Sequence, residues 1–242
     1  MQQKLKRIVG AALLALAAVP QSANHLTQSA AAQEKPAAQA NPRPPAERFD
    51  MQVRADFFAG LAGDRGRFDK AMKLTEEILA KNPKHAEALV WHGSGVFTRA
   101  GLAFRKGDTN TGLALWQKGL DEMQTAVTLE PENVGVLIPR AAVLLEASKY
   151  VPMPDMVRKL LETAVNDYEK VLRLRQGYFQ QVAAHGRGDL LSALASGWQR
   201  LGKEEQARAY TQRIVSELPG TAYAERAKNW QTKARMPRTW PS

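Results

Sequence analysis

Histidine offers this chain its most direct routes to metal binding and acid–base catalysis, because imidazole ligates zinc and titrates near neutral pH. The chain has 242 residues, four histidines and no cysteine. The histidines are His25, His85, His92 and His185, and no two of them share the short helical spacing of a zinc site. We therefore expect neither a metal nor a cofactor.

Paired carboxylates and glycine-rich segments could also contribute to catalysis. The Glu-Glu pairs at 76–77 and 204–205 have lysine and arginine nearby, which is typical of solvated helix surfaces. The glycine-rich segments 93–95 and 186–188 do not continue into the Lys-Ser or Lys-Thr of a phosphate-binding loop. The sequence thus predicts a protein that is not an enzyme.

Residues 187–189 spell Arg-Gly-Asp, a tripeptide that adhesion receptors recognise. A short tripeptide also arises by chance. Asp189 is a good N-cap for a following helix, and we take capping as the explanation.

The elements that would position a site show a repeated spacing. A small residue is followed four and seven positions later by further residues of a helical stripe, and twelve positions later by proline, which ends the helix. The three sets are Ala71, Thr75, Ile78 and Pro83; Gly119, Met123, Ala126 and Pro131; and Ala207, Thr211, Ile214 and Pro219. Such recurrence predicts repeated helical hairpins.

The spacing of apolar residues predicts an all-α fold after residue 48, with no convincing strand pattern. We expect Asp108 or Thr109 to cap one helix and Asp155 to cap another. The expected helices are 69–82, 85–105, 109–130, one through 141–147, one from 155 through 172, 190–201, 204–218 and 222–233.

This pattern resembles the tetratricopeptide repeat (TPR) family over about residues 51–218. The best match is Leu191, Leu194, Ala195, Trp198, Ala207, Ile214 and Pro219, and a second is Ala55, Phe58, Ala59, Ala71, Ile78 and Pro83. A third unit would end near Gln176. The prolines lie 48 and 88 residues apart rather than the family's roughly 34, so the middle units should be longer. The resemblance implies a right-handed α-solenoid of about four hairpins, with 222–233 as a capping helix.

The resemblance also implies a concave groove lined by the first helix of each hairpin. The groove positions that we expect to bind a partner are Phe57, Val90, Trp91, Phe97, Gln199 and Arg200. Exposed aromatic groups there would anchor a peptide, whereas burial against a neighbouring helix is the alternative for Trp91 and Phe97. The family's carboxylate clamp is absent, because its positions hold Asp56 and Gly60.

The start of the chain is typical of a secretory signal peptide. Basic residues precede an unbroken apolar run from Ile8 to Val19, and we expect signal peptide 1–23 with cleavage between residues 23 and 32. Its removal takes away Lys4, Lys6 and Arg7 and lowers the formal net charge from +10 to +7. Without a cysteine for lipid attachment, we expect a periplasmic or secreted protein, with a Pro/Ala-rich linker over 24–48 and a helical domain over 49–233.

The C-terminal end, including a basic tail over 234–242, could contact an anionic envelope surface weakly, and a frayed, solvated tail is the alternative. Its basic residues are Arg226, Lys228, Lys233, Arg235 and Arg238. A secreted destination makes nucleic acid an unexpected partner.

Together these features predict a non-catalytic scaffold or adaptor of the bacterial cell envelope that binds a protein or peptide. The alternative is a small-molecule or anion-binding auxiliary of a transporter, with a pocket between the lengthened central hairpins. The sequence specifies no oligomeric state.

Overall fold

The computed structural model describes residues 48–235 of the chain. Contacts divide the chain into Met1–Pro42 and Arg43–Ser242, and the described residues all belong to the second unit. The predicted signal peptide, nearly all of the predicted linker and residues 236–242 of the tail lie outside them. None of the helices in the described part combines the length and the hydropathy needed to cross a bilayer.

The described residues form α-helices joined by short turns, with one 3-10 helix and no strand among them. The elements are α2 (Phe49–Leu61), α3 (Arg65–Lys81), α4 (Ala86–Arg105), α5 (Thr109–Leu129), α6 (Val134–Ala147), α7 (Pro154–Leu174), η2 (Gln176–Gln181), α8 (Ala184–Arg200), α9 (Glu204–Glu217) and α10 (Ala222–Arg235).

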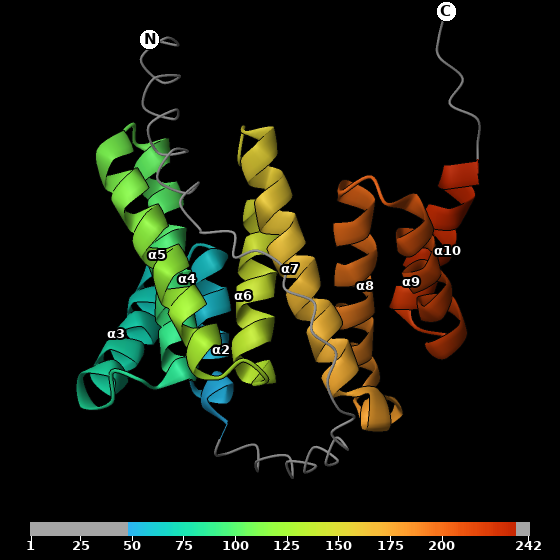
Figure 1. Ribbon diagram of the computed structural model, residues 1–242, viewed down its shortest axis with the longest axis horizontal. Coiled ribbons are helices and arrows are strands. Elements are labelled where there is room, and N and C mark those ends of the chain that lie inside the picture. The colour runs from blue at the N-terminus through green and yellow to red at the C-terminus, as the bar shows by residue number, and fades with distance from the viewer. Residues whose placement is uncertain (1–47, 236–242) are drawn as a thin grey trace, which may run out of the picture. The chain divides into compact units, whose positions relative to one another are not determined.

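These helices pack as four consecutive hairpins, α2–α3, α4–α5, α6–α7 and α8–α9, with α10 against α9 (Figure 1). Contacts also join α2 to α4, α4 to α6 and α6 to α8, so the first helices of the hairpins form one layer. The predicted all-α array of four hairpins with a terminal helix is confirmed. The middle hairpins are longer, as expected: α4, α5 and α7 have 20, 21 and 21 residues, against 13 in α2.

The repeated spacing marks the side of each second helix that faces its hairpin partner. Ala71, Gly119 and Ala207 are all buried, and each begins its stripe. At Gly119, an added Cβ would lie 2.7 Å from the carbonyl oxygen of Gly93 on α4. A small residue therefore lets the two helix backbones approach closely.

The hairpin turns have a recurring chemistry. Gly63, Gly107 and Gly202 have φ of 115°, 80° and 74°, a conformation that favours glycine. In the first two hairpins an aspartate follows and caps the second helix: Asp64 accepts from the backbone N–H of residue 67, and Asp108 from that of residue 111, both at 3.1 Å. Asp108 is thus the N-cap, one of the two residues expected there.

Two other predicted caps are wrong. Helix α7 begins at Pro154, a residue whose fixed φ suits the first helical position, so Asp155 lies inside the helix. Helix α8 begins at Ala184, well before the predicted start at residue 190, and Asp189 lies in its second turn. The two glycines in this first part of α8 concealed the helical pattern in the sequence.

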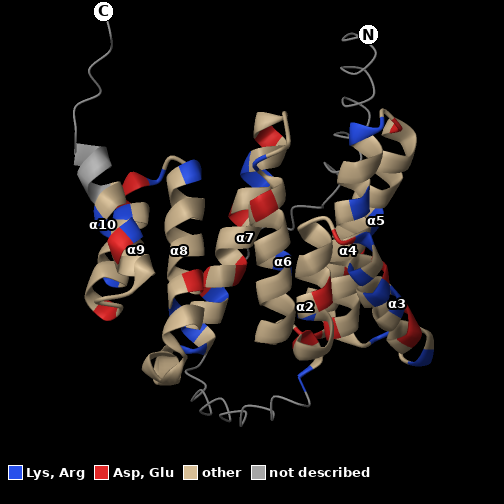
Figure 2. Ribbon diagram, turned by 180° about the vertical axis from the view of Figure 1, so that it is seen from behind, with Lys and Arg blue, Asp and Glu red and all other residues tan. Residues whose placement is uncertain are grey.

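A buried arginine, Arg140, joins three helices in the middle of the array through an ion pair and a hydrogen bond. The Nε and Nη2 atoms of Arg140 on α6 donate to the two carboxylate oxygens of Asp167 on α7, each at 2.7 Å, and Nη1 donates to Gln124 Oε1 on α5 at 2.8 Å. The rest of α6 is nearly free of charge (Figure 2). Arg140 thus holds α6 against both α5 and α7.

Candidate interaction surface

Four of the predicted groove residues lie in the core. Phe57, Val90, Trp91 and Phe97 are at most 5% exposed, and the rings of Phe57 and Trp91 pack 5.1 Å apart. Helix α4 is buried at nearly every position from 86 to 97, because α2, α3, α5 and α6 all pack against it. The expectation that Phe57 and Val90 are exposed groove residues is therefore wrong, and for Trp91 and Phe97 the alternative of burial against neighbouring helices holds.

The other two predicted groove residues lie near the end of α8. Gln199 is exposed, whereas Arg200 is half-buried and its Nη1 donates to the carbonyl oxygen of Leu145 at 3.0 Å. Arg200 thus connects α8 to α6. Contact of Gln199 and Arg200 with a partner stays a prediction.

The basic residues of α10 that the structure describes have partners inside the chain. The guanidinium of Arg226 lies 4.8 Å from the ring centre of Tyr223, and Lys228 pairs with Glu225 at 2.9 Å. The side chains of Lys233 and Arg235, and all of Arg238, lie outside the described residues. Contact with an anionic surface stays a prediction.

Large exposed apolar side chains gather on α2, which sequence reasoning did not single out as a binding surface. Met51, Phe58 and Leu61 are 50%, 52% and 45% exposed, and Ala55 and Ala62 are also exposed. Residues 51, 55, 58 and 62 follow offsets of four, seven and eleven, so they form one stripe along the helix, with residue 61 beside it. We call these five residues the α2 edge.

The α2 edge is exposed because α2 is the outermost described helix of the first-helix layer. Helix α4 has a first-helix neighbour on each side, α2 and α6, whereas the main contacts of α2 are α3 and α4. Val53 and Phe57 fill the buried side of α2. A helix that is apolar on both sides is normally covered on both. That two-sided pattern is the sequence signal that could have revealed the edge.

A further large exposed apolar side chain, Leu102, lies on the neighbouring helix α4. Trp91 of α4 faces α2, with its ring centre 6.4 Å from that of Phe58. Leu102 follows Trp91 by about three helical turns, so it lies on the same side of α4, roughly 16 Å further along. Helix α2 ends at Leu61, too early to cover it, and Leu102 is 40% exposed.

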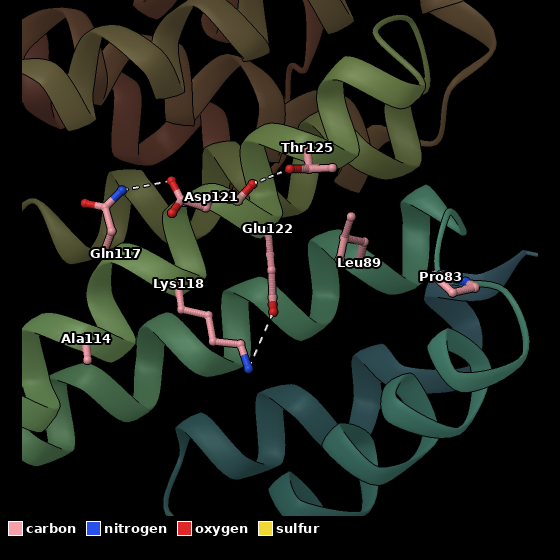
Figure 3. A pocket seen from close by; sticks show the side chains of 8 residues that line it. All are labelled: Pro83, Leu89, Ala114, Gln117, Lys118, Asp121, Glu122 and Thr125. Carbon is pink, nitrogen blue, oxygen red and sulfur yellow. Dashed lines mark hydrogen bonds and ion pairs between the residues drawn. The ribbon is translucent and has the colours of Figure 1, made fainter. Parts of the chain in front are cut away.

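A shallow open groove of about 600 Å³ runs beside α5 (Figure 3). Its polar side chains contact one another: Gln117 donates to Asp121 at 2.8 Å, and Lys118 lies 3.8 Å from Glu122. The groove lies along the α4–α5 hairpin and the turn before it, and not between two hairpins. Its lining residues are Pro83, Leu89, Ala114, Gln117, Lys118, Asp121, Glu122 and Thr125.

His92 contacts Glu122, one of the residues that line this groove. Its Nδ1 lies 2.7 Å from Glu122 Oε2, and its Nε2 lies 3.8 Å from Glu76 Oε1. In the part of the chain that the structure describes, no group of three or more His, Asp or Glu side chains is arranged to hold a metal ion. The His92 contacts instead hold α4 beside α5.

The Arg-Gly-Asp tripeptide lies inside α8 and is partly covered by α10. The Tyr223 hydroxyl donates to Asp189 at 2.5 Å and lies 2.6 Å from His185 Nδ1. An added Cβ on Gly188 would lie 2.6 Å from the Tyr223 ring. Burial and the hydrogen bond to Asp189 raise the pKa of Tyr223 to about 12. The tripeptide therefore takes part in helix packing.

No family model matches the chain, and no curated protein matches it. Among solved structures, a TPR protein of the thermophile Thermus thermophilus is similar over 74% of this chain and 99% of its own, with 17% sequence identity and a TM-score of 0.36. The all-α hairpin architecture therefore rests on the packing of the chain's own helices.

Proposed function

We propose that this protein is a non-catalytic helical-repeat scaffold that binds a protein partner through the α2 edge. The observation that supports the proposal is the gathering of exposed Met51, Phe58 and Leu61 on one helix at the end of the layer. Other large exposed apolar residues, such as Tyr150 and Tyr178, lie apart in the sequence. Contiguous exposed apolar surface is typical of protein interaction sites.

The composition of the edge suits a protein partner. Phe58 lies in the middle of the stripe, where an aromatic side chain contributes most to binding once the residues around it exclude water. Full burial of such a side chain stabilises a complex by about 1.5–3 kcal/mol, so covering the remaining half contributes about 1 kcal/mol. Three such large apolar residues can support a specific but moderate affinity.

The cellular location of the scaffold is a further part of the proposal. The predicted signal peptide supports a bacterial envelope location, in the periplasm or outside the cell. Fractionation of cells and N-terminal sequencing of the mature chain test it directly. Recovery from the cytoplasm with an intact N-terminus would contradict this location and leave the binding surface unaffected.

A photoreactive phenylalanine analogue placed at Phe58 tests the binding surface in cells. Tyr178 is the matched control, because it is aromatic, 44% exposed and outside the α2 edge. We expect protein adducts with the analogue at position 58 and few at 178. Equal labelling at the two positions, or no protein adduct at 58, would contradict the proposal.

A further inference from the structure

We propose that the partner at the α2 edge is a second copy of this chain, bound through two antiparallel α2 helices about a two-fold axis. This inference rests on the proposed function, because it names the occupant of the same surface. It is supported by the order of side-chain sizes along α2 and by the ion pairing of its charged residues within each copy.

The stripe is self-complementary in size when its direction is reversed. Along α2 it runs Met51, Ala55, Phe58, Ala62, which is large, small, large, small. Read backwards, the same stripe runs small, large, small, large. Two antiparallel copies can therefore place every large side chain against a small one, which is how helices pack closely.

This order fixes the register of the pair. With the two-fold axis midway between residues 56 and 57, Phe58 of one copy lies opposite Ala55 of the other. In the same register, Met51 of one copy lies opposite Ala62 of the other. A parallel pair in register would place Phe58 against Phe58 and leave the alanines facing a gap, so the antiparallel pair is favoured.

The charges of α2 permit two copies to approach. The whole chain has a formal net charge of +10, which opposes self-association through most surfaces. Helix α2 carries one arginine, Arg54, and two aspartates, so its own formal charge is −1. Asp50 pairs with Arg48 at 2.7 Å and with Arg54 at 3.8 Å. Asp56 pairs with Arg67 at 2.7 Å and with Lys70 at 2.8 Å, so both aspartates of α2 are ion-paired within each copy.

A two-fold contact also makes the most of a small surface. In a symmetric dimer both sides of the contact are the same α2 edge, so each of its residues contributes buried surface from both copies. A different partner would have to supply apolar surface of its own. The edge is short, since α2 has 13 residues. We therefore expect a dimer of moderate stability, with a dissociation constant in about the micromolar range.

Exchanging the large and small residues tests both the dimer and its register. Sedimentation equilibrium of the mature chain, purified after removal of the predicted signal peptide, should show a monomer–dimer equilibrium. Phe58→Ala should raise the dissociation constant at least about tenfold, because it empties two contacts per dimer. Ala55→Phe should do the same, because two phenylalanine side chains would then compete for the same space. The double exchange A55F/F58A restores large against small and should recover at least half of the dimer.

The absence of cysteine allows a second, covalent test of the register. Ala55→Cys and Phe58→Cys chains, mixed under mild oxidation, should form disulfide-linked pairs faster than either chain alone. Ala222→Cys, at an exposed position on α10, is the control and should form few. Circular dichroism at each step shows whether the variant remains helical, and only variants with unchanged helicity are compared.

Each outcome bears on one of the two proposals. A wild-type chain that stays monomeric would show that no dimer forms. A dimer whose dissociation constant is unchanged by Phe58→Ala and Ala55→Phe would show that the dimer does not form through α2. Either result would overturn this proposal. If the analogue at position 58 still attaches to a different protein, the scaffold proposal stands without the dimer. If it attaches to no protein at all, both proposals fail.

Discussion

Replacing Arg140 with methionine should destabilise the protein by about 3–5 kcal/mol at neutral pH, because it leaves a buried carboxylate without its partner. Arg140 and Asp167 have side chains 9% and 6% exposed and share two hydrogen bonds of 2.7 Å. Methionine keeps most of the side-chain volume of arginine. The loss in the free energy of unfolding therefore reports the removal of the positive charge and not the creation of a cavity. The same substitution also removes the hydrogen bond to Gln124.

The pH dependence of this loss follows from Asp167. Burial raises the pKa of its carboxyl above the usual range, against the lowering effect of Arg140. A carboxyl whose pKa is raised by folding contributes stability that is fully present below its unfolded pKa, about 3.9, and lost as pH rises through the folded pKa. Without Arg140 the folded pKa rises further. Arg140→Met should therefore regain stability relative to wild type on acidification from pH 7 to about pH 4.5.

Urea unfolding followed by circular dichroism, at both pH values, measures these differences. The double variant R140M/D167L is the control, because it removes both charges and should cost less than Arg140→Met alone. A single variant that loses under about 1 kcal/mol at neutral pH would refute the reasoning. So would a double variant as unstable as the single one, or a loss that does not shrink in acid.

Three further predictions concern packing and titration. Gly119→Ala should lower the free energy of unfolding by about 1–3 kcal/mol, because the new Cβ would lie 2.7 Å from the α4 backbone. Gly177→Ala is the control and should change the free energy of unfolding little, because no atom lies within 4 Å of its added Cβ. Urea unfolding of the two variants measures the difference. Trp91→Ala should cost about 3–5 kcal/mol because the side chain is 5% exposed, and a partner-binding defect at unchanged melting temperature would contradict this. Asp189→Asn should lower the pKa of Tyr223 from about 12 toward its ordinary value of 10.0, because the hydrogen-bond acceptor loses its negative charge. Ultraviolet titration of the tyrosines measures this pKa. An unchanged pKa would show that the Asp189 carboxylate does not raise it.

Local spacing carried enough information to predict most of the fold. The offsets from Ala71, Gly119 and Ala207 identify the second helices of three hairpins, because a close helix crossing needs a small residue at a fixed place in each stripe. The unequal proline intervals correctly indicated longer middle helices. The start of α8 was missed, because Gly186 and Gly188 interrupt the apolar periodicity that marks a helix.

The interaction surface was harder to predict, because exposure depends on neighbours far along the chain. Trp91 occupies a position that the family resemblance assigns to a groove, yet α2 lies against it. Phe58 matches the repeat pattern as well as a core residue would. It is nevertheless half exposed, because its side of α2 lacks a helix neighbour among the described residues. A sequence pattern records that a side chain is apolar, and only the packing shows which side is covered.

The packing of each hairpin mainly against the next one has a consequence for how the molecule opens. Most contacts join elements close in sequence, so a terminal hairpin can detach without breaking the interior of the array. Amide hydrogens should therefore exchange fastest in α10, which packs mainly on α9, and slowest in α4, which is held by four helices. Pulling on the two ends of the chain would peel the array inward from its ends, with the α4–α5 crossing at Gly93 and Gly119 among the last to open.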